Sequence, residues 1–222
     1  MTLAFRTVSG SRLSGLNVGE SDQDFLEVRV GSTLQYCGVM DVREASQVNS
    51  DGVDVRTFDL RKFARLLMAG NYACLSSLYA PVEQIDFCHP AFFQFVTARR
   101  HFVGQNAVMA ALGQAKGDLH RMTEHGFDAK TAARALFLVH EAQTMLLKGD
   151  LDVKASTLPL AVRAGRILEP EFRVVFKESL ERANVLMENP FKKADFAGVR
   201  KADPEFVSQL VAGVVFKVWG FA

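Results

Sequence analysis

The sequence has few of the residues that build disulfide frameworks and zinc sites. It contains three cysteines in 222 residues, widely spaced and with no Cys-x-x-Cys pair. An odd, scattered set of this kind excludes a disulfide scaffold and a structural zinc site. It is typical of reduced, buried thiols, so we expect a cytoplasmic protein. The five histidines show no metal-ligand spacing either.

Long apolar runs and a strong net charge are also missing. No apolar run reaches membrane-spanning length, and the first residues lack the pattern of a signal peptide, so we expect no membrane attachment. The net charge of +1 gives no global basic field of the kind that advertises nucleic-acid binding. The absence of Gly-x-x-x-x-Gly-Lys and Gly-x-Gly-x-x-Gly loops argues against P-loop and Rossmann chemistry.

The apolar pattern changes its period along the chain. β-branched and aromatic runs predict strands over residues 3–8, 25–30, 35–40 and 53–58. Helical spacing then begins at Leu60, with Asp59 as the expected N-cap and Gly70-Asn71 as the stop. From Pro90 onward, spacing and prolines predict helices over residues 92–112, 129–147, 159–167, 170–187 and 204–219. We therefore expect an α+β protein that divides near residue 85.

Two short motifs near the N-terminus have the chemistry of a nucleotide site. Gly10-Ser11 is a turn in which backbone N–H groups can approach a phosphate, because glycine lacks a Cβ atom. Asp22 and Asp24 are two residues apart, so on a strand both carboxylates face the same side, roughly 7 Å apart at Cα. Paired carboxylates suit Mg²⁺ bound to a substrate phosphate. An ordinary Ser-Asp turn entering an edge strand is the structural alternative.

A Gly-Ser turn, a gap of ten residues and an Asp-x-Asp pair together resemble the signature of the DNA polymerase β-type nucleotidyltransferase superfamily. Over residues 3–165 the chain is similar to the branch of predicted nucleotidyltransferases found beside RNA ligases. The segment 58–71 matches the Arg-Lys-Phe … Leu … Gly-Asn helix of that branch. The resemblance implies a small mixed β-sheet nucleotidyltransferase core over 1–85 and a C-terminal helical subdomain over 86–222.

The resemblance also implies a third carboxylate from a neighbouring strand, and Asp54 matches it best. Asp59 is the competitor, but its role as helix N-cap is sufficient to explain it. We therefore expect Asp22, Asp24 and Asp54 to be the catalytic residues and the ligands of Mg²⁺, with two ions in the complete site.

Basic residues are the candidates for contacts with phosphate. Arg12 follows the turn and is either a phosphate-binding fork or a solvated turn residue. Lys62 matches the lysine of the family helix, and Lys130 and Arg134 lie one turn apart on the polar side of a predicted helix. For each of them, a solvated helix face is the alternative. The expected nucleotide-binding residues are therefore Gly10, Ser11, Arg12, Lys62, Lys130 and Arg134.

One position departs from the family pattern. Ser76 stands where the branch has a glutamate near the centre of a helix. This difference predicts a changed substrate contact or a diverged acceptor specificity.

The function expected from these residues is Mg²⁺-dependent nucleotidyl transfer with release of pyrophosphate. The donor is a nucleoside triphosphate, with ATP expected, and the expected acceptor is an RNA end. The alternatives are transfer of AMP to a protein hydroxyl, transfer to a small molecule, and a non-catalytic nucleotide-binding regulatory module. The sequence does not fix the donor base, the acceptor or the oligomeric state.

Overall fold

The structure is a computed structural model that describes residues 1–19, 22–37, 44–50, 52–188 and 202–220. Its strands are β1 (Thr2–Val8), β2 (Gln23–Val30), β3 (Ala45–Ser50), β4 (Val53–Asp59) and β5 (Ile85–Cys88). Its α-helices are α1 (Gly10–Ser14), α2 (Thr33–Cys37), α3 (Leu60–Met68), α4 (Tyr72–Ser77), α5 (Phe93–Thr97), α6 (Gln105–His125), α7 (Ala129–Lys148), α8 (Thr157–Arg163), α9 (Glu169–Glu188) and α10 (Pro204–Val218). Three short 3-10 turns are η1 (Val82–Gln84), η2 (Pro90–Phe92) and η3 (Arg99–Phe102). None of the helices in the described ranges is long and apolar enough to cross a membrane.

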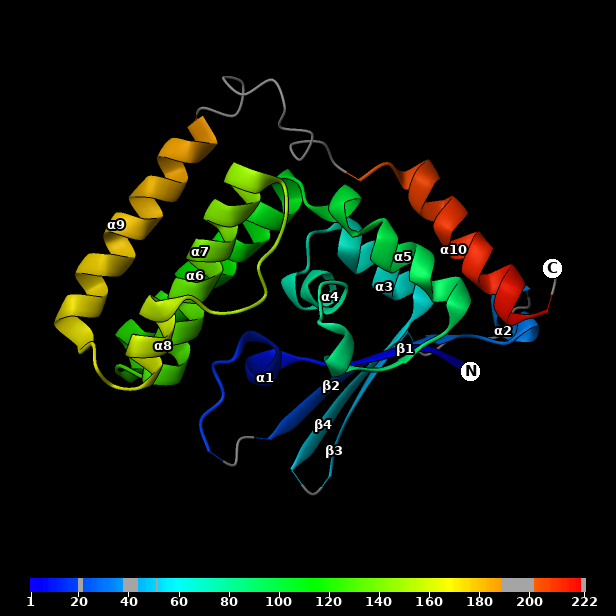
Figure 1. The fold of residues 1–222 in the computed structure, drawn as a ribbon, viewed down its shortest axis with the longest axis horizontal. Helices are drawn as coiled ribbons and strands as arrows, with labels where there is room; N and C mark the ends of the chain where they lie inside the picture. Colours follow the sequence, from blue (N-terminus) through cyan, green and yellow to red (C-terminus); the bar gives the residue numbers. More distant parts are fainter. Residues whose placement is uncertain (20–21, 38–43, 51, 189–201, 221–222) are drawn as a thin grey trace.

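The strands form one mixed sheet with the order β3-β4-β2-β1-β5. β2 and β4 are parallel neighbours, and the other pairs are antiparallel. Figure 1 shows α3, α5 and α10 on one side of this sheet and α6 to α9 gathered beside it, with α1 between the sheet and those helices. The expected α+β class with a mixed sheet is confirmed.

Helix α3 illustrates how the sequence places an element on the sheet. Leu60, Phe63 and Leu67 follow helical spacing and are all buried, whereas the polar positions between them stay at the surface. Asp59 caps the helix by accepting the Arg61 N–H at 3.0 Å, as expected from the sequence. The same carboxylate accepts the Tyr36 hydroxyl at 2.5 Å, so this buried charge is well paired.

Phenylalanine rings join the sheet to the helices above it. Phe5 of β1 stacks on Phe92 with ring centroids 4.7 Å apart, and Phe92 stacks on Phe95 of α5 at 5.3 Å. Phe63 of α3 contacts both Phe92 and Phe95. These rings belong to one cluster of buried side chains that continues into α6, α7 and α9. The two halves of the chain therefore share one hydrophobic core.

Several elements differ from the sequence-based expectations. The strand expected over 35–40 is wrong in its described part, because Thr33–Cys37 forms the short helix α2; residues 38–40 lie outside the described residues. The helix expected over 92–112 is interrupted, because Gly104 is extended and starts α6 as a new helix. β3 and β5 were not expected. β3 is polar and mostly exposed, so its strand conformation comes from pairing with β4 and not from an apolar pattern.

The division of the chain at residue 85 stays a prediction. Two elements of the expected helical half lie with the sheet. β5 pairs with β1 at the edge of the sheet. α10 returns to contact α3, and the Trp219 indole N–H that follows it donates to the Gly31 carbonyl at 3.0 Å. Figure 1 accordingly shows the end of α10 on the same side of the molecule as the N-terminus.

Candidate active site

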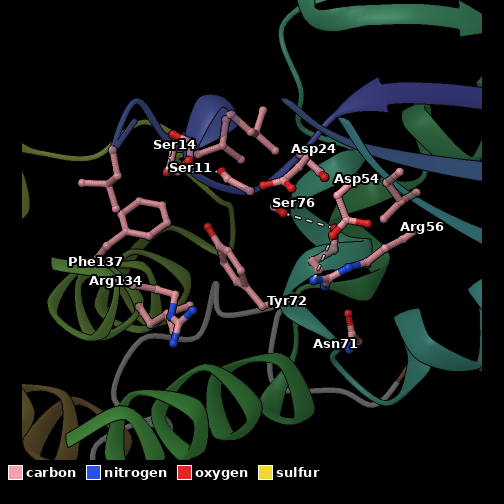
Figure 2. A pocket seen from close by; sticks show the side chains of 18 of the residues that line it. Ser11, Ser14, Asp24, Asp54, Arg56, Asn71, Tyr72, Ser76, Arg134 and Phe137 are labelled. Carbon is pink, nitrogen blue, oxygen red and sulfur yellow. Dashed lines mark hydrogen bonds and ion pairs between the residues drawn. The ribbon is translucent and has the colours of Figure 1, made fainter. Parts of the chain in front are cut away.

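A pocket of about 430 Å³ lies where the sheet meets α1, α4 and the helices α6 and α7. The sheet supplies Asp24, Asp54 and Arg56, and the turn at α1 supplies Gly10 and Ser11. The opposite wall comes from α4 and from one face of α7. Figure 2 shows side chains from these separate elements pointing toward one space. Residues far apart in the sequence therefore form one polar pocket.

Asp24 and Asp54 are brought together by the parallel pairing of their strands, in which they are direct partners. Burial and the nearby Asp54 carboxylate raise the pKa of Asp24, although Arg56 and Lys130 oppose this shift. The Oδ2 atom of Asp54 accepts the Gln47 side-chain amide at 2.7 Å. Its Oδ1 atom is buried and makes no hydrogen bond within the described part of the chain. A divalent cation would satisfy this oxygen and offset the repulsion between the two carboxylates.

Gly10 lies against the Asp24 carboxylate. A Cβ atom at position 10 would come within 2.2 Å of Asp24 Oδ2, and φ is +65°, a conformation that favours glycine. The adjacent Ser9 N–H donates to the Asp24 carbonyl at 2.8 Å, which holds the turn on β2. The Gly-Ser turn and the strand carboxylate, predicted as separate motifs, therefore meet in the structure.

Asp22 is near enough for its charge to contribute to the raised pKa of Asp24, but it does not line the pocket with the pair. Its side chain is exposed at the start of β2 and is not among the residues that line the pocket. Its Oδ1 atom lies 3.8 Å from the position that a Cβ atom on Gly52 would occupy. Within the described ranges, no group of three or more His, Cys, Asp or Glu side chains is placed to hold a metal ion. The structure thus brings together two of the three predicted carboxylates.

Helix α7 supplies the basic wall of the pocket, with Lys130 and Arg134 among the lining residues. The Arg134 guanidinium makes a bidentate pair with Asp118 of α6, at 2.8 Å from Nε and 2.6 Å from Nη2. Asp118 is only 2% exposed. The sequence analysis did not identify Asp118 as a site residue. A carboxylate on the otherwise apolar helix face of Ala111, Ala115 and Met122 was the signal that could have identified it.

The other predicted basic residues lie outside the pocket lining. Lys62 Nζ is 3.8 Å from Glu44 Oε2, and Arg65 of the same helix also pairs with Glu44. Arg12 lies on α1 but is not among the lining residues. The basic cluster of α3 therefore neutralises an acidic neighbour instead of facing the carboxylate pair.

Helix α4 closes the pocket on a third side. Asn71 caps this helix by accepting the Cys74 N–H at 3.1 Å. Ser76, which stands where the resembled branch has glutamate, lines the pocket and donates its hydroxyl to the Ala73 carbonyl at 3.2 Å. Tyr72 also lines the pocket. The sequence analysis identified neither Tyr72 nor Gln47, whose amide donates to Asp54. Tyr72 directly follows the Gly70-Asn71 motif, which was a signal for it, whereas Gln47 has no neighbouring motif.

Two hydrogen bonds tie α1 to the helical part of the chain. The Ala155 N–H donates to the Ser14 carbonyl at 2.8 Å. The Arg163 Nε–H donates to the Leu16 carbonyl at 3.0 Å. The Gly10-Ser11 turn is thus fixed from both sides, by β2 and by the segment around α8.

Comparison with known proteins identifies the family of this chain. A family model described as RNA repair pathway DNA polymerase beta family (RlaP) matches residues 1–164. Among solved structures, a nucleotidyltransferase-like protein from Exiguobacterium sibiricum is similar, with 12% identity and a TM-score of 0.31 over 84% of this chain and 69% of that chain. A search of the curated proteins finds no match. Since the family model covers most of the chain, the protein belongs to the RNA repair pathway DNA polymerase beta family and is a nucleotidyltransferase of the polymerase β type.

Proposed function

We propose that this nucleotidyltransferase moves a nucleoside monophosphate from a nucleoside triphosphate, with ATP the expected donor, to the end of an RNA chain. The observation that supports the proposal most directly is the Asp24–Asp54 pair, which lies under the Gly10 turn and faces a wall with Lys130 and Arg134. Acidic side chains and phosphate-binding groups on opposite walls are the arrangement that nucleotidyl transfer requires.

The two carboxylates fit a divalent cation, because one buried oxygen of Asp54 has no partner in the described residues and the Asp24 pKa is raised beside it. Asp24 and Asp54 would hold Mg²⁺, and Asp22 is the third proposed ligand. When bound, Mg²⁺ neutralises charge that develops on the phosphate oxygens, and two ions are expected in the complete site. Gln47 orients Asp54 by its hydrogen bond, which leaves the second oxygen directed away from β3.

The triphosphate is proposed to lie between α1 and α7. Gly10 lets the backbone approach the phosphates, and Ser11 supplies a backbone N–H and a hydroxyl. Arg134 is a planar donor that Asp118 holds in one orientation, and Lys130 adds a second positive charge. Lys62 and Arg12 remain proposals for contact with the acceptor or the nucleotide, although neither lines the pocket.

In the proposed reaction, a hydroxyl oxygen of the acceptor attacks the α-phosphorus. The new oxygen–phosphorus bond forms as the bond between the α-phosphorus and the bridging oxygen breaks, and pyrophosphate leaves. The hydroxyl proton is released to solvent water as the new bond forms. The chain's own residues therefore supply positioning and charge.

The RNA end is the proposed acceptor because of the family's description as part of an RNA repair pathway. Arg56 lines the pocket beside Asp54 and keeps 55% of its side chain exposed, which suits contact with a phosphate backbone. We propose that the reaction takes place in the cytoplasm, where the free cysteines stay reduced.

The test is transfer of label from each α-³²P nucleoside triphosphate, with Mg²⁺, to RNA ending in a 3′-hydroxyl, to RNA blocked at that end, and to lysate protein. We expect label on RNA with a free end, and a loss of about a hundredfold or more in Asp24→Asn and Asp54→Asn. Asp86→Asn is the matched control, because Asp86 is an exposed carboxylate outside the pocket that pairs with Arg6.

The other outcomes separate the alternatives. Label on protein alone would contradict the RNA acceptor and support AMP transfer to a side-chain hydroxyl. Metal-dependent binding of triphosphate without transfer to RNA, protein or small molecules would support a regulatory module. Full activity in a folded Asp24→Asn/Asp54→Asn double variant would remove the carboxylate assignment.

A further inference from the structure

Tyr72 has a buried hydroxyl with no hydrogen-bond partner among the described residues. Its oxygen has almost no exposure to solvent and makes no hydrogen bond within the residues that the structure describes. The ring lines the pocket and meets Phe137 of α7 edge to face, with centroids 6.0 Å apart and planes at 85°. A buried hydroxyl without a partner costs about 1–3 kcal/mol, so its presence in a pocket wall points to a partner absent from the free protein.

The direction of the ring identifies which part of the pocket this hydroxyl faces. Figure 2 shows the Tyr72 oxygen pointing toward the turn that carries Ser11 and Ser14, with the Phe137 ring and Arg134 beside the tyrosine ring. The hydroxyl therefore lies between the glycine-serine turn and the basic wall of α7. This is the part of the pocket where the triphosphate is proposed to lie.

The surroundings also decide whether Tyr72 donates or accepts. Burial, followed by the charges of Glu141 and Asp152, raises the pKa of Tyr72 well above its ordinary value. The phenol therefore keeps its proton across the whole usable pH range and can donate it to an anion. Glu141 is itself buried, and a pKa of about 8 leaves it largely neutral near pH 7, while Asp152 is exposed, so solvent screens its charge.

We infer that the Tyr72 hydroxyl donates a hydrogen bond to a phosphate oxygen in the terminal part of the bound triphosphate, between Ser11 and Arg134. This inference rests on the proposed function. A phosphate is favoured over the nucleoside because the Tyr72 oxygen points toward the turn that carries Ser11 and Ser14, and because Lys130 and Arg134 line the same pocket. Tyr72 acts as a binding residue, and the reaction needs no proton from it.

The test is calorimetric binding of inorganic tripolyphosphate, ATP and AMP to wild type and Tyr72→Phe. We expect tripolyphosphate and ATP to bind about tenfold more weakly to the variant, with AMP unchanged, because one charge-assisted hydrogen bond is lost. Tyr36→Phe is the matched control, since Tyr36 lies outside the pocket and donates to Asp59. It should bind all three ligands as wild type does.

Thermal unfolding provides a second readout in the same variants. Tyr72→Phe should be as stable as wild type or more stable, because the hydroxyl it removes has no partner among the residues that the structure describes. Tyr36→Phe should be less stable, because it leaves the buried Asp59 short of a donor. If Tyr72→Phe does not fold, tyrosine labelled with ¹³C at Cζ gives the answer in wild type, where tripolyphosphate should shift Tyr72 and leave Tyr36 and Tyr79 in place.

Two results would overturn the inference. Unchanged tripolyphosphate binding with weakened ATP and AMP would assign Tyr72 to the nucleoside, and unchanged binding of all three would leave it without a ligand. Failure of wild type to bind either tripolyphosphate or ATP, with or without Mg²⁺, would instead reject the proposed function itself.

Discussion

At the scale of single residues, the site depends on the close approach of the Gly10 backbone to the Asp24 carboxylate. Gly10 and Asp24 are fourteen positions apart in the sequence, yet there is no room between them for a methyl group. The turn must therefore be glycine for the carboxylate to keep its position. Gln47 has a similar local role, because its amide holds one Asp54 oxygen and leaves the other for the pocket.

Gly10→Ala should abolish transfer and destabilise the protein by more than the backbone strain alone. The strain of a left-handed alanine is about 1–2 kcal/mol, and the new Cβ also meets the Asp24 carboxylate at 2.2 Å. Gly15→Ala is the matched control, since Gly15 has φ +74° but nothing within 4 Å of its Cβ position. Urea unfolding and the transfer assay measure both effects. Equal losses in the two variants would show that the contact with Asp24 is unimportant.

Gln47→Ala should lower kcat about tenfold, because Asp54 loses the donor that fixes its orientation. KM for the triphosphate should stay near the wild-type value, since the phosphate-binding residues are untouched. Val48→Ala, at a 60% exposed position of the same strand, is the control for disturbance of β3. Steady-state kinetics of both variants measures kcat and KM separately. A change confined to KM would argue against the role of Gln47 in orienting Asp54.

At the scale of elements, α7 connects the pocket to the segment that follows it. Arg134 lies on its pocket side, and Glu141 lies two turns later in the interior. Glu141 is 3% exposed, and its Oε2 atom accepts the Asp152 N–H at 3.2 Å. Because the same segment bonds to α1 through Ala155, α7 indirectly fixes the turn at Gly10-Ser11.

The buried Glu141 predicts a pH dependence of stability. Burial raises its pKa from 4.5 to about 8, so the folded protein holds a proton that the unfolded chain releases above pH 4.5. The stabilising contribution of Glu141 to the free energy of unfolding is fully present below pH 4.5 and is lost as the pH rises through 8. Between these limits it lowers the free energy of unfolding by up to about 1.4 kcal/mol per pH unit.

Glu141→Gln should remove this slope, because the amide keeps an acceptor for the Asp152 N–H without a titrating group. The measurement is urea unfolding of both proteins from pH 5 to pH 8.5. The difference in unfolding free energy should grow in favour of the variant as the pH rises. A constant difference would mean that Glu141 is already ionised at pH 5.

At the scale of the whole molecule, the C-terminal helix belongs to the sheet layer. α10 lies outside the segment matched by the family model, yet Val207, Leu210 and Val214 are buried in the common core. The sequence analysis expected a core over 1–85 and a helical subdomain over 86–222. Helix α10 belongs to the second range but packs with elements of the first.

Val214→Ala should destabilise the sheet layer and the helices together, by about 2 kcal/mol, because a fully buried side chain is cut back in a shared core. Val174→Ala on α9 is the control, since that side chain is 57% exposed. Chemical denaturation measures the loss of stability. Hydrogen exchange of the backbone amides in β1 and α7 then shows whether the two elements are destabilised together. Destabilisation of β1 without α7 would support two independent units.

The sequence alone determined the features that depend on neighbours in the chain. The Gly10-Ser11 turn, the alternation that puts Asp24 on a strand, and the helix begun by Asp59 are each set by local backbone preferences. The resemblance built on these motifs was enough to identify the family. Asp54 was also named in advance, although its pairing with Asp24 became visible only in the sheet.

Only the tertiary structure decided which side chains share the pocket. Lys62 and Arg134 look alike as helical cations, but one meets Glu44 and the other is presented beside the pocket by Asp118. Tyr72 and Gln47 were not identified, because their roles come from contacts with distant segments. Hydrogen bonds and burial depend on spatial neighbours, which a local pattern does not specify, so the chemistry of this site required the fold.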